Sequence, residues 1–208
     1  DYYWQNPAYE SYYEDLVSQR YKNPSEATKI RPVLMMVHGF GASPFEWLEC
    51  KQFLETHTDS LISNVYLGGH HDLHLFASCT WQDWLQPICD EYQRLIQLGF
   101  ETISIVGCST GATLILQGLQ GQCFLPSAAL KHIFLIDPFL RATSPLLAYM
   151  PTLAFMTFPQ RLCLTKIESR HWLPCRPANA LHQLHQLSIK TQSDLHKGLR
   201  YASSIQIH

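Results

Sequence analysis

The chain carries little charge and almost no excess of either sign. Its 208 residues contain 15 lysines and arginines against 17 aspartates and glutamates, which gives a formal net charge of -2 with histidine neutral. Nucleic-acid-binding domains usually carry a positive excess, and segments that bind anionic membranes carry clustered basic residues. The composition therefore gives no reason to expect either partner.

Long apolar runs are also missing. A membrane-spanning helix needs about 20 consecutive apolar residues, and the runs in this sequence are far shorter. No basic stretch followed by an apolar stretch opens the chain, so we expect no signal peptide. The chain begins at Asp1 rather than at a methionine, which predicts a processed start or a segment of a longer protein.

Paired cysteine motifs are absent. A zinc site or a disulfide framework normally uses an even, closely spaced set of cysteines. This chain has an odd set without a C-x-x-C pair: Cys50, Cys79, Cys89, Cys108, Cys123, Cys163 and Cys175. The pattern favours buried free thiols in a reducing compartment, and we therefore expect a cytoplasmic protein.

The pattern that is present from Val33 onward alternates strands with helices. Apolar runs with strand character are VLMMVHG, ISNVYLGG, ETISIVG, KHIFLIDPF and YASSIQIH. Helical spacing lies between them, in WLECKQFLETH, WQDWLQPICDEYQRLIQLG, GATLILQGLQG and ANALHQLHQLSIKTQSDLHKGL. Largely apolar strands that alternate with helices are typical of a parallel sheet covered on both faces. We predict an α/β fold: a three-layer α/β/α sandwich with a mostly parallel sheet.

The expected domain organisation is simple. With 46% apolar residues, the chain can bury one sizeable core. Residues 1–32 form an N-terminal segment and residues 33–208 the core. Between residues 139 and 177 many prolines and apolar residues interrupt the alternation, and we expect small helices there that form a lid over one edge of the sheet.

One short motif points to nucleophilic chemistry. Gly107-Cys108-Ser109-Thr110-Gly111 matches G-x-S-x-G, and it lies between a predicted strand and a predicted helix. In that context the serine occupies a strained turn, and the flanking glycines let neighbouring backbone approach without a clash. Ser109 is therefore the candidate nucleophile. Cys108 is expected to point away from the cleft into the core.

A second motif supports the first. His38-Gly39-Phe40-Gly41 follows the first buried strand. An acyl-transfer site needs two backbone N–H groups to hold the oxyanion that forms during the reaction. We expect the N–H groups of Phe40 and Thr110 to form this oxyanion hole.

Together these stretches resemble the α/β-hydrolase fold. Within it VLMMVHGFGASPFEW, YLGGHHD, TWQDW and ISIVGCSTGATLIL are most similar to small carboxylesterases and monoacylglycerol lipases. The resemblance covers the chain from about Val33 to its end. It implies a serine hydrolase without a cofactor that cleaves short- to medium-chain or monoacylglycerol-like lipophilic esters through an acyl-enzyme. The partner it implies is a small-molecule ester, with an acyl pocket lined by the apolar lid.

The catalytic acid and base are not evident. In the resembled family the acid and then a histidine follow the serine, after strands that lie beyond the lid. The resemblance therefore predicts that both follow His208, and that the 208 residues alone bind better than they catalyse. Asp137, at the end of the fourth strand, is the one candidate acid within the chain, although capping a turn before Pro138 explains it as well.

Two other functions stay open. Without acid and base, the chain could be a catalytically inactive binding module with an α/β-hydrolase core. The cluster His70, His71, Asp72 and His74 has the spacing of metal ligands, which would suit a metal-dependent hydrolase. An ordinary loop near the site entrance accounts for this cluster better. His171, His182, His185 and His196 are expected on the lid or the surface.

Overall fold

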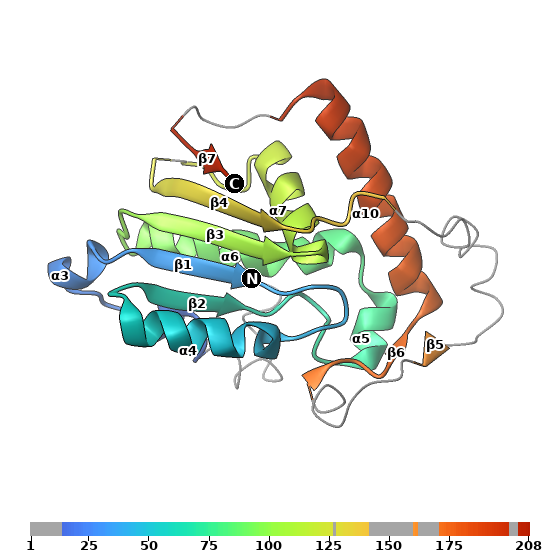
Figure 1. Cartoon of the computed structure of the whole chain (residues 1–208), viewed down its shortest axis with the longest axis horizontal. Coiled ribbons are helices and arrows are strands. Elements are labelled where there is room, and N and C mark those ends of the chain that lie inside the picture. The colour runs from blue at the N-terminus through green and yellow to red at the C-terminus, as the bar shows by residue number, and fades with distance from the viewer. Residues whose placement is uncertain (1–13, 127, 142–159, 162–170, 200–203) are drawn as a thin grey trace.

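The computed structural model describes residues 14–126, 128–141, 160–161, 171–199 and 204–208 (Figure 1). Within them lies a five-stranded sheet with the strand order β2-β1-β3-β4-β7. Each neighbouring pair in this sheet is parallel. Its strands are β1 (Val33–Val37), β2 (Leu61–Val65), β3 (Ile103–Cys108), β4 (Leu130–Ile136) and β7 (Gln206–Ile207). The parallel sheet that the apolar strands predict is confirmed.

Helices connect the strands as the spacing predicts. The described helical elements are α2 (Val17–Arg20), α3 (Glu26–Lys29), η2 (Pro44–Trp47), α4 (Leu48–His57), α5 (Leu73–Ser78), α6 (Trp81–Gln97), α7 (Thr110–Gln120) and α10 (Ala178–Lys197). The start of α6 shows the local cause most clearly. The Thr80 side chain accepts the backbone N–H of Asp83, and the Asp83 carboxylate accepts the backbone N–H of Thr80, so two N–H groups left over at the helix start are satisfied.

The helices cover the two faces of the sheet, which confirms the three-layer fold. In Figure 1, α4 lies on one face, and α6 and α7 lie on the other. The side chains of β1 contribute to the cores on both faces of the sheet, because successive side chains of a strand point to opposite faces. Val33, Met35 and Val37 belong to the large core beside α6 and α7. Met36 belongs to a small core together with Trp47.

Two local expectations are corrected by the structure. The loop expected around His70 ends before the last histidine of the cluster, because residues 73–78 form the short helix α5, which Asp72 caps by accepting the N–H groups of His74 and Leu75. The stretch WLECKQFLETH forms α4, but its apolar residues are only partly covered. Leu54 packs against the small core, whereas Phe53 is 59% exposed and Cys50 is exposed.

The prediction of free thiols is wrong for two of the cysteines. Cys89 on α6 and Cys123, which follows α7, form a disulfide with their Cα atoms 5.4 Å apart. The two residues are separated by 34 positions, so no short cysteine motif predicts that they pair. Cys50, Cys108 and Cys175 are free thiols.

The N-terminal segment packs on the core from residue 16 onward. Val17 is fully buried in the large core. The buried carboxylate of Glu91 on α6 accepts hydrogen bonds from the hydroxyls of Ser18 and Ser63 and from the Ser18 N–H. These bonds join the segment to α6 and β2. The division at residue 32 stays a prediction.

The lid prediction falls mostly outside the described residues. Of residues 139–177 the structure describes 139–141, 160–161 and 171–177. There β5 (Gln160–Arg161) pairs antiparallel with β6 (Cys175–Arg176). Among the residues that the structure describes, no helix combines the length and the apolar character needed to cross a membrane.

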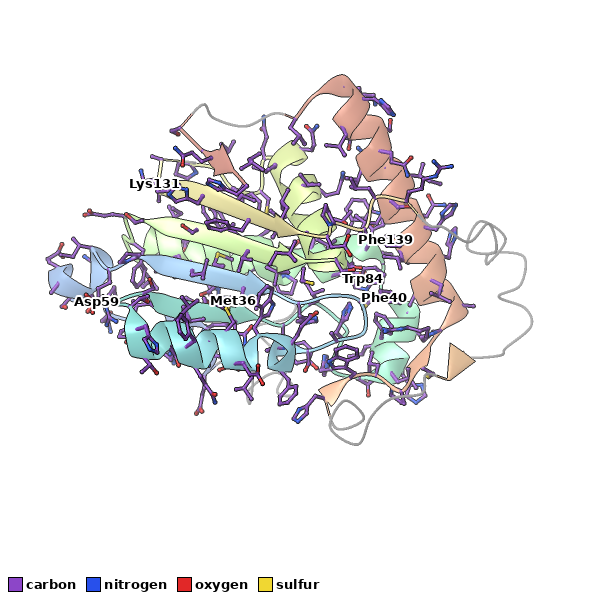
Figure 2. The ribbon with its side chains drawn as sticks, in the orientation of Figure 1. Met36, Phe40, Asp59, Trp84, Lys131 and Phe139 are labelled. Carbon is purple, nitrogen blue, oxygen red and sulfur yellow. A yellow bond between two sulfur atoms is a disulfide. The ribbon has the colours of Figure 1, made fainter. Side chains whose placement is uncertain are left out.

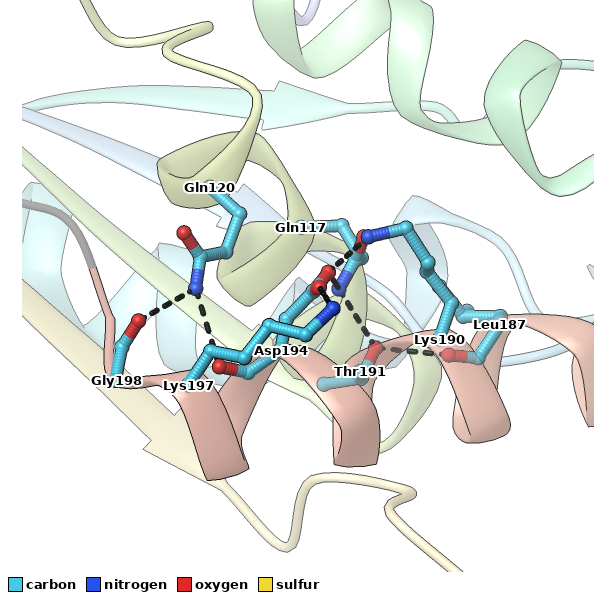
Figure 3. Close-up of polar contacts among 8 residues, drawn as sticks. All are labelled: Gln117, Gln120, Leu187, Lys190, Thr191, Asp194, Lys197 and Gly198. Atoms are coloured by element: carbon cyan, nitrogen blue, oxygen red, sulfur yellow. Dashed lines mark hydrogen bonds and ion pairs between the residues drawn. The ribbon is translucent and has the colours of Figure 1, made fainter.

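A polar cluster attaches α10 to α7 (Figure 3). Gln117 on α7 donates to the Thr191 hydroxyl at 3.1 Å and to the Asp194 carboxylate at 3.3 Å. Gln120 donates to the backbone carbonyl of Gly198 at 2.9 Å. Asp194 also pairs with Lys190. Because α7 begins directly after Ser109, this cluster fixes α10 against the helix that carries the candidate site.

Candidate active site

Ser109 occupies a strained turn between β3 and α7. Its φ is 51° and its ψ is -115°, a backbone conformation that residues other than glycine seldom adopt. Two glycines make the turn possible. A Cβ at Gly107 would lie 2.7 Å from the backbone nitrogen of Ala112, and one at Gly111 would lie 2.6 Å from the backbone oxygens of Val37 and His38. The strand and the helix can meet this closely only without those side chains.

The backbone of Ser109 is held, while its hydroxyl is not. The Ser109 N–H donates to the Ile136 carbonyl at 2.9 Å, and the Ser109 carbonyl accepts the Phe139 N–H at 3.3 Å. Within the described part of the chain the hydroxyl makes no hydrogen bond, to a histidine or to another group. The residue is therefore fixed in place with its reactive oxygen uncommitted.

The loop after β1 lies beside this turn. Because Val37 pairs with Gly107 in the parallel register, residues 38–41 continue next to Cys108 and Ser109. A Cβ built on Gly39 would lie 3.6 Å from the Cβ of Ser109. The structure thus brings the His-Gly-Phe-Gly motif and the serine motif together, as the sequence predicts.

The peptide between Gly39 and Phe40 has a fixed orientation. The Gly39 carbonyl accepts Nδ1–H of His38 at 2.9 Å and the N–H of Ala42 at 3.3 Å. In a trans peptide the N–H points opposite to the carbonyl, so the Phe40 N–H points away from His38. Among the described residues, neither this N–H nor that of Thr110 donates to a protein acceptor. The two predicted oxyanion donors are both uncommitted.

His38 supports this loop and is not a base. It is fully buried, and burial lowers its pKa to about 4, so the ring is neutral at pH 7. Its Nε2 accepts the Leu67 N–H at 3.0 Å, which leaves the single proton on Nδ1. Both ring nitrogens are therefore used in holding backbone.

The Phe40 side chain is anchored in aromatic packing below the loop. Its ring centroid lies 5.1 Å from that of Phe76 and 5.6 Å from that of Trp84. Figure 2 shows Phe40, Trp84 and Phe139 at the end of the sheet toward which the strands run, and Asp59 and Lys131 at the opposite end. The candidate site thus lies at the carboxyl ends of the strands, where parallel α/β sheets bind their ligands.

Cys108 is unsuited to act as a nucleophile. Burial, together with the nearby carboxylates of Glu46 and Asp137, raises the pKa of its thiol to about 11. A thiol reacts as the thiolate, and this one stays protonated at pH 7. The side chain packs against the small core around Met36 and Trp47, in agreement with the expectation that it points into the core.

Asp137 lies beside the strained turn at Ser109, because Cys108 pairs with Ile136 in the parallel register, but it has no partner histidine in the described residues. It follows β4 in an exposed turn and has a φ of 45°. The preceding residue, Ile136, accepts the Ser109 N–H. Its role as an acid stays a prediction.

The histidine cluster after β2 is not arranged as a metal site. His70 is buried against Phe76 and Trp84. Asp72 caps α5, and His74 is exposed. Within the described ranges no group of three histidine, cysteine, aspartate or glutamate side chains could hold a metal ion. The geometry favours the loop interpretation of this cluster.

Two further features flank the loop. His171 stacks on Phe45, with ring centroids 3.8 Å apart. A cavity of about 380 Å³ lies between Phe45, Asn64, His70 and Leu173. Ser109 is not among the residues that line this cavity.

Comparison with known proteins identifies the fold. No family model and no curated protein sequence matches the chain. A solved structure of metagenome-derived lipolytic enzymes described as LipS and LipT matches with a TM-score of 0.59 and 20% identity, over 79% of this chain and 66% of that chain. The monoacylglycerol lipase of Paleococcus ferrophilus matches with a TM-score of 0.58 and 10% identity, over 86% and 84% of the two chains.

A third match is a soluble variant of the monoglyceride lipase from Saccharomyces cerevisiae in complex with a substrate analogue. Its TM-score is 0.54 at 14% identity, over 89% of this chain and 69% of that chain. The chain therefore has the α/β-hydrolase fold, which confirms the resemblance at the level of the fold. The chain spans 66% of the length of the metagenome-derived chain. The activity of the whole protein is therefore treated as a proposal below.

Proposed function

We propose that the protein is a serine ester hydrolase in which Ser109 attacks the acyl carbonyl. One observation carries the proposal. Ser109 is held in a strained turn with its hydroxyl uncommitted, beside two backbone N–H groups that also lack a protein acceptor among the described residues. Structural neighbours named as lipases support it.

The N–H groups of Phe40 and Thr110 hold the oxyanion of the tetrahedral intermediate. Thr110 is the first residue of α7, so its N–H lies at the positive end of the helix dipole. Removing one donor of an oxyanion hole typically costs about 3 kcal/mol of transition-state stabilisation. Two such donors beside the nucleophile make acyl transfer the chemistry that this arrangement favours.

The proposed substrate is a lipophilic ester with a short to medium acyl chain, or a monoacylglycerol-like ester. This part rests on the apolar sequence LLAYMPTLAFMTF in the predicted lid and on neighbours named as monoacylglycerol lipases. No cofactor is proposed, because acyl transfer through a serine requires none.

The proposal needs a general base. A serine without one is weakly nucleophilic, and no histidine bonds Ser109 in the described part of the chain. The prediction that the acid and the histidine follow residue 208 stays a prediction, with Asp137 as the candidate acid within the chain. The lack of a histidine bonded to Ser109 in the described residues also supports the second candidate function, a catalytically inactive binding module with the α/β-hydrolase fold.

Ester hydrolysis by neighbouring variants separates these functions. We expect the longest available form of the protein to cleave p-nitrophenyl butyrate and octanoate. Ser109→Ala should abolish cleavage, whereas Cys108→Ala should retain it because that thiol stays protonated. Absence of hydrolysis by the unsubstituted protein would favour the binding module. Activity that survives Ser109→Ala but is lost with a chelator would favour the metal-dependent enzyme.

A further inference from the structure

The segment that contains β6 makes direct contacts with the loop that carries Phe40. Nη1 of Arg176 donates to the Phe40 carbonyl at 2.5 Å, across 136 positions of sequence. The Leu173 N–H donates to the carbonyl of Gly41 at 2.9 Å. Two successive carbonyls of the loop are therefore held by one segment that is distant in the sequence.

Arg176 also holds the Phe40 side chain. The guanidinium carbon lies 4.9 Å from the centroid of the Phe40 ring, which is within the range of a cation–π contact. The same ring also packs against Phe76 and Trp84. One arginine thus contacts both the backbone and the ring of the same residue, and the planar guanidinium is suited to both contacts in a way that an ammonium group is not.

Gly41 makes room for this arginine. Its φ is +66°, and a Cβ there would lie 1.7 Å from Nη1 of Arg176. Any other residue at position 41 would displace the guanidinium. The second glycine of the motif therefore has a structural reason that involves Arg176, in addition to its backbone conformation.

We propose that Arg176 is a positioning residue of the oxyanion hole. The inference rests on the proposed function, because it assigns a task to the Phe40 N–H. The peptide before Phe40 is fixed through the Gly39 carbonyl, which accepts from His38 and Ala42. Arg176 fixes the peptide after it. With both adjoining peptides held, the direction of the Phe40 N–H is determined before substrate binds.

The kinetic test compares Arg176→Met with Arg176→Lys. A misplacement of about 1 Å in a catalytic group can cost roughly 100-fold in rate, so we expect kcat to fall about 10- to 100-fold in Arg176→Met. KM should change little, because the ground-state ester does not depend on the oxyanion donors. Arg176→Lys should recover only part of kcat. A third variant, Arg176→Ala, leaves space for a guanidinium ion, so added guanidinium should restore part of its activity. A variant that is inactive only because it is less stable would not be rescued in this way.

Arg31→Met is the matched control. Nε of Arg31 also donates to a backbone carbonyl, that of Asp59, at 2.9 Å, but this contact lies at the opposite end of the sheet (Figure 2). Its kcat should equal that of the unsubstituted protein. An Arg176→Met protein that keeps full kcat while the unsubstituted protein is active overturns the inference and leaves the proposed function intact.

Amide hydrogen exchange provides a readout that does not need activity. Residues 38–43 should exchange faster in Arg176→Met than in the unsubstituted protein, and Arg31→Met should leave them unchanged. If the unsubstituted protein hydrolyses no ester but this difference appears, the positioning contact stands and the proposed function fails. Unchanged exchange in Arg176→Met overturns the positioning role in either case.

Discussion

Replacing Gly111 by alanine should damage the candidate site through the backbone alone. The new Cβ would lie 2.6 Å from the backbone oxygens of Val37 and His38. Carbon and carbonyl oxygen normally keep about 3.3 to 3.6 Å apart. The N-terminus of α7 must therefore retreat by roughly 0.7 to 1 Å, the difference between these separations.

The consequence for stability is a difference between two effects. Overpacking of this kind costs about 1 to 3 kcal/mol. In a helix interior alanine is favoured over glycine by about 1 kcal/mol, and at Gly111, the second residue of α7, a smaller gain offsets part of that cost. We expect the free energy of unfolding to fall by about 1 kcal/mol.

The consequence for activity is larger, because Ser109 and Thr110 move with the helix. A displacement near 1 Å predicts a loss of kcat of roughly 10- to 100-fold. Urea denaturation measures the first quantity and ester hydrolysis the second.

Gly121→Ala is the matched control. This glycine follows the same helix, its φ is -77°, and a Cβ there would meet only the Gln117 carbonyl, at 3.3 Å. It should keep kcat. If Gly111→Ala matched Gly121→Ala in both kcat and stability, the steric account of the turn would be refuted.

The remaining predictions concern stability. Cys123→Ser should lower the free energy of unfolding by about 4 kcal/mol at most, because the disulfide closes a loop of 34 residues and so reduces the entropy of the unfolded chain. The control Cys50→Ser should leave the free energy of unfolding unchanged. Equal urea midpoints for the two variants would contradict the disulfide. Burial raises the pKa of Glu91 above its ordinary value of 4.5, so the folded state binds more protons than the unfolded state above that pH. This contribution to stability is present below pH 4.5 and is lost as the pH rises toward the folded-state pKa. Glu91→Gln should flatten that part of the pH profile, and an unaltered slope would count against a buried carboxylate.

Most of the sheet could be predicted because each strand is an apolar run bounded by turn residues. The strained turn at Ser109 could be predicted for the same reason, since residues 107–111 lie between a strand and a helix that the sequence pattern makes evident. The helix α5 was not predicted, because it has only six residues and begins in a histidine-rich stretch. Asp72 is a good N-cap residue, and that signal could have identified the helix.

Contacts between distant residues could not be predicted. Cys89 and Cys123 meet because α6 and the end of α7 pack together, and nothing near either cysteine encodes that. Arg176 reaches Phe40 across 136 positions, and no local motif marks this arginine.

The central claim is that Ser109 is a nucleophile, and covalent labelling tests it most directly. The protein would be treated with a fluorophosphonate, which transfers a phosphonyl group to activated serines, and then analysed by intact and peptide mass spectrometry. We predict one adduct per chain, located on Ser109, absent from Ser109→Ala and retained in Cys108→Ala. An unlabelled Ser109 in the longest available form of the protein, or equal labelling of Ser109→Ala, would contradict the claim.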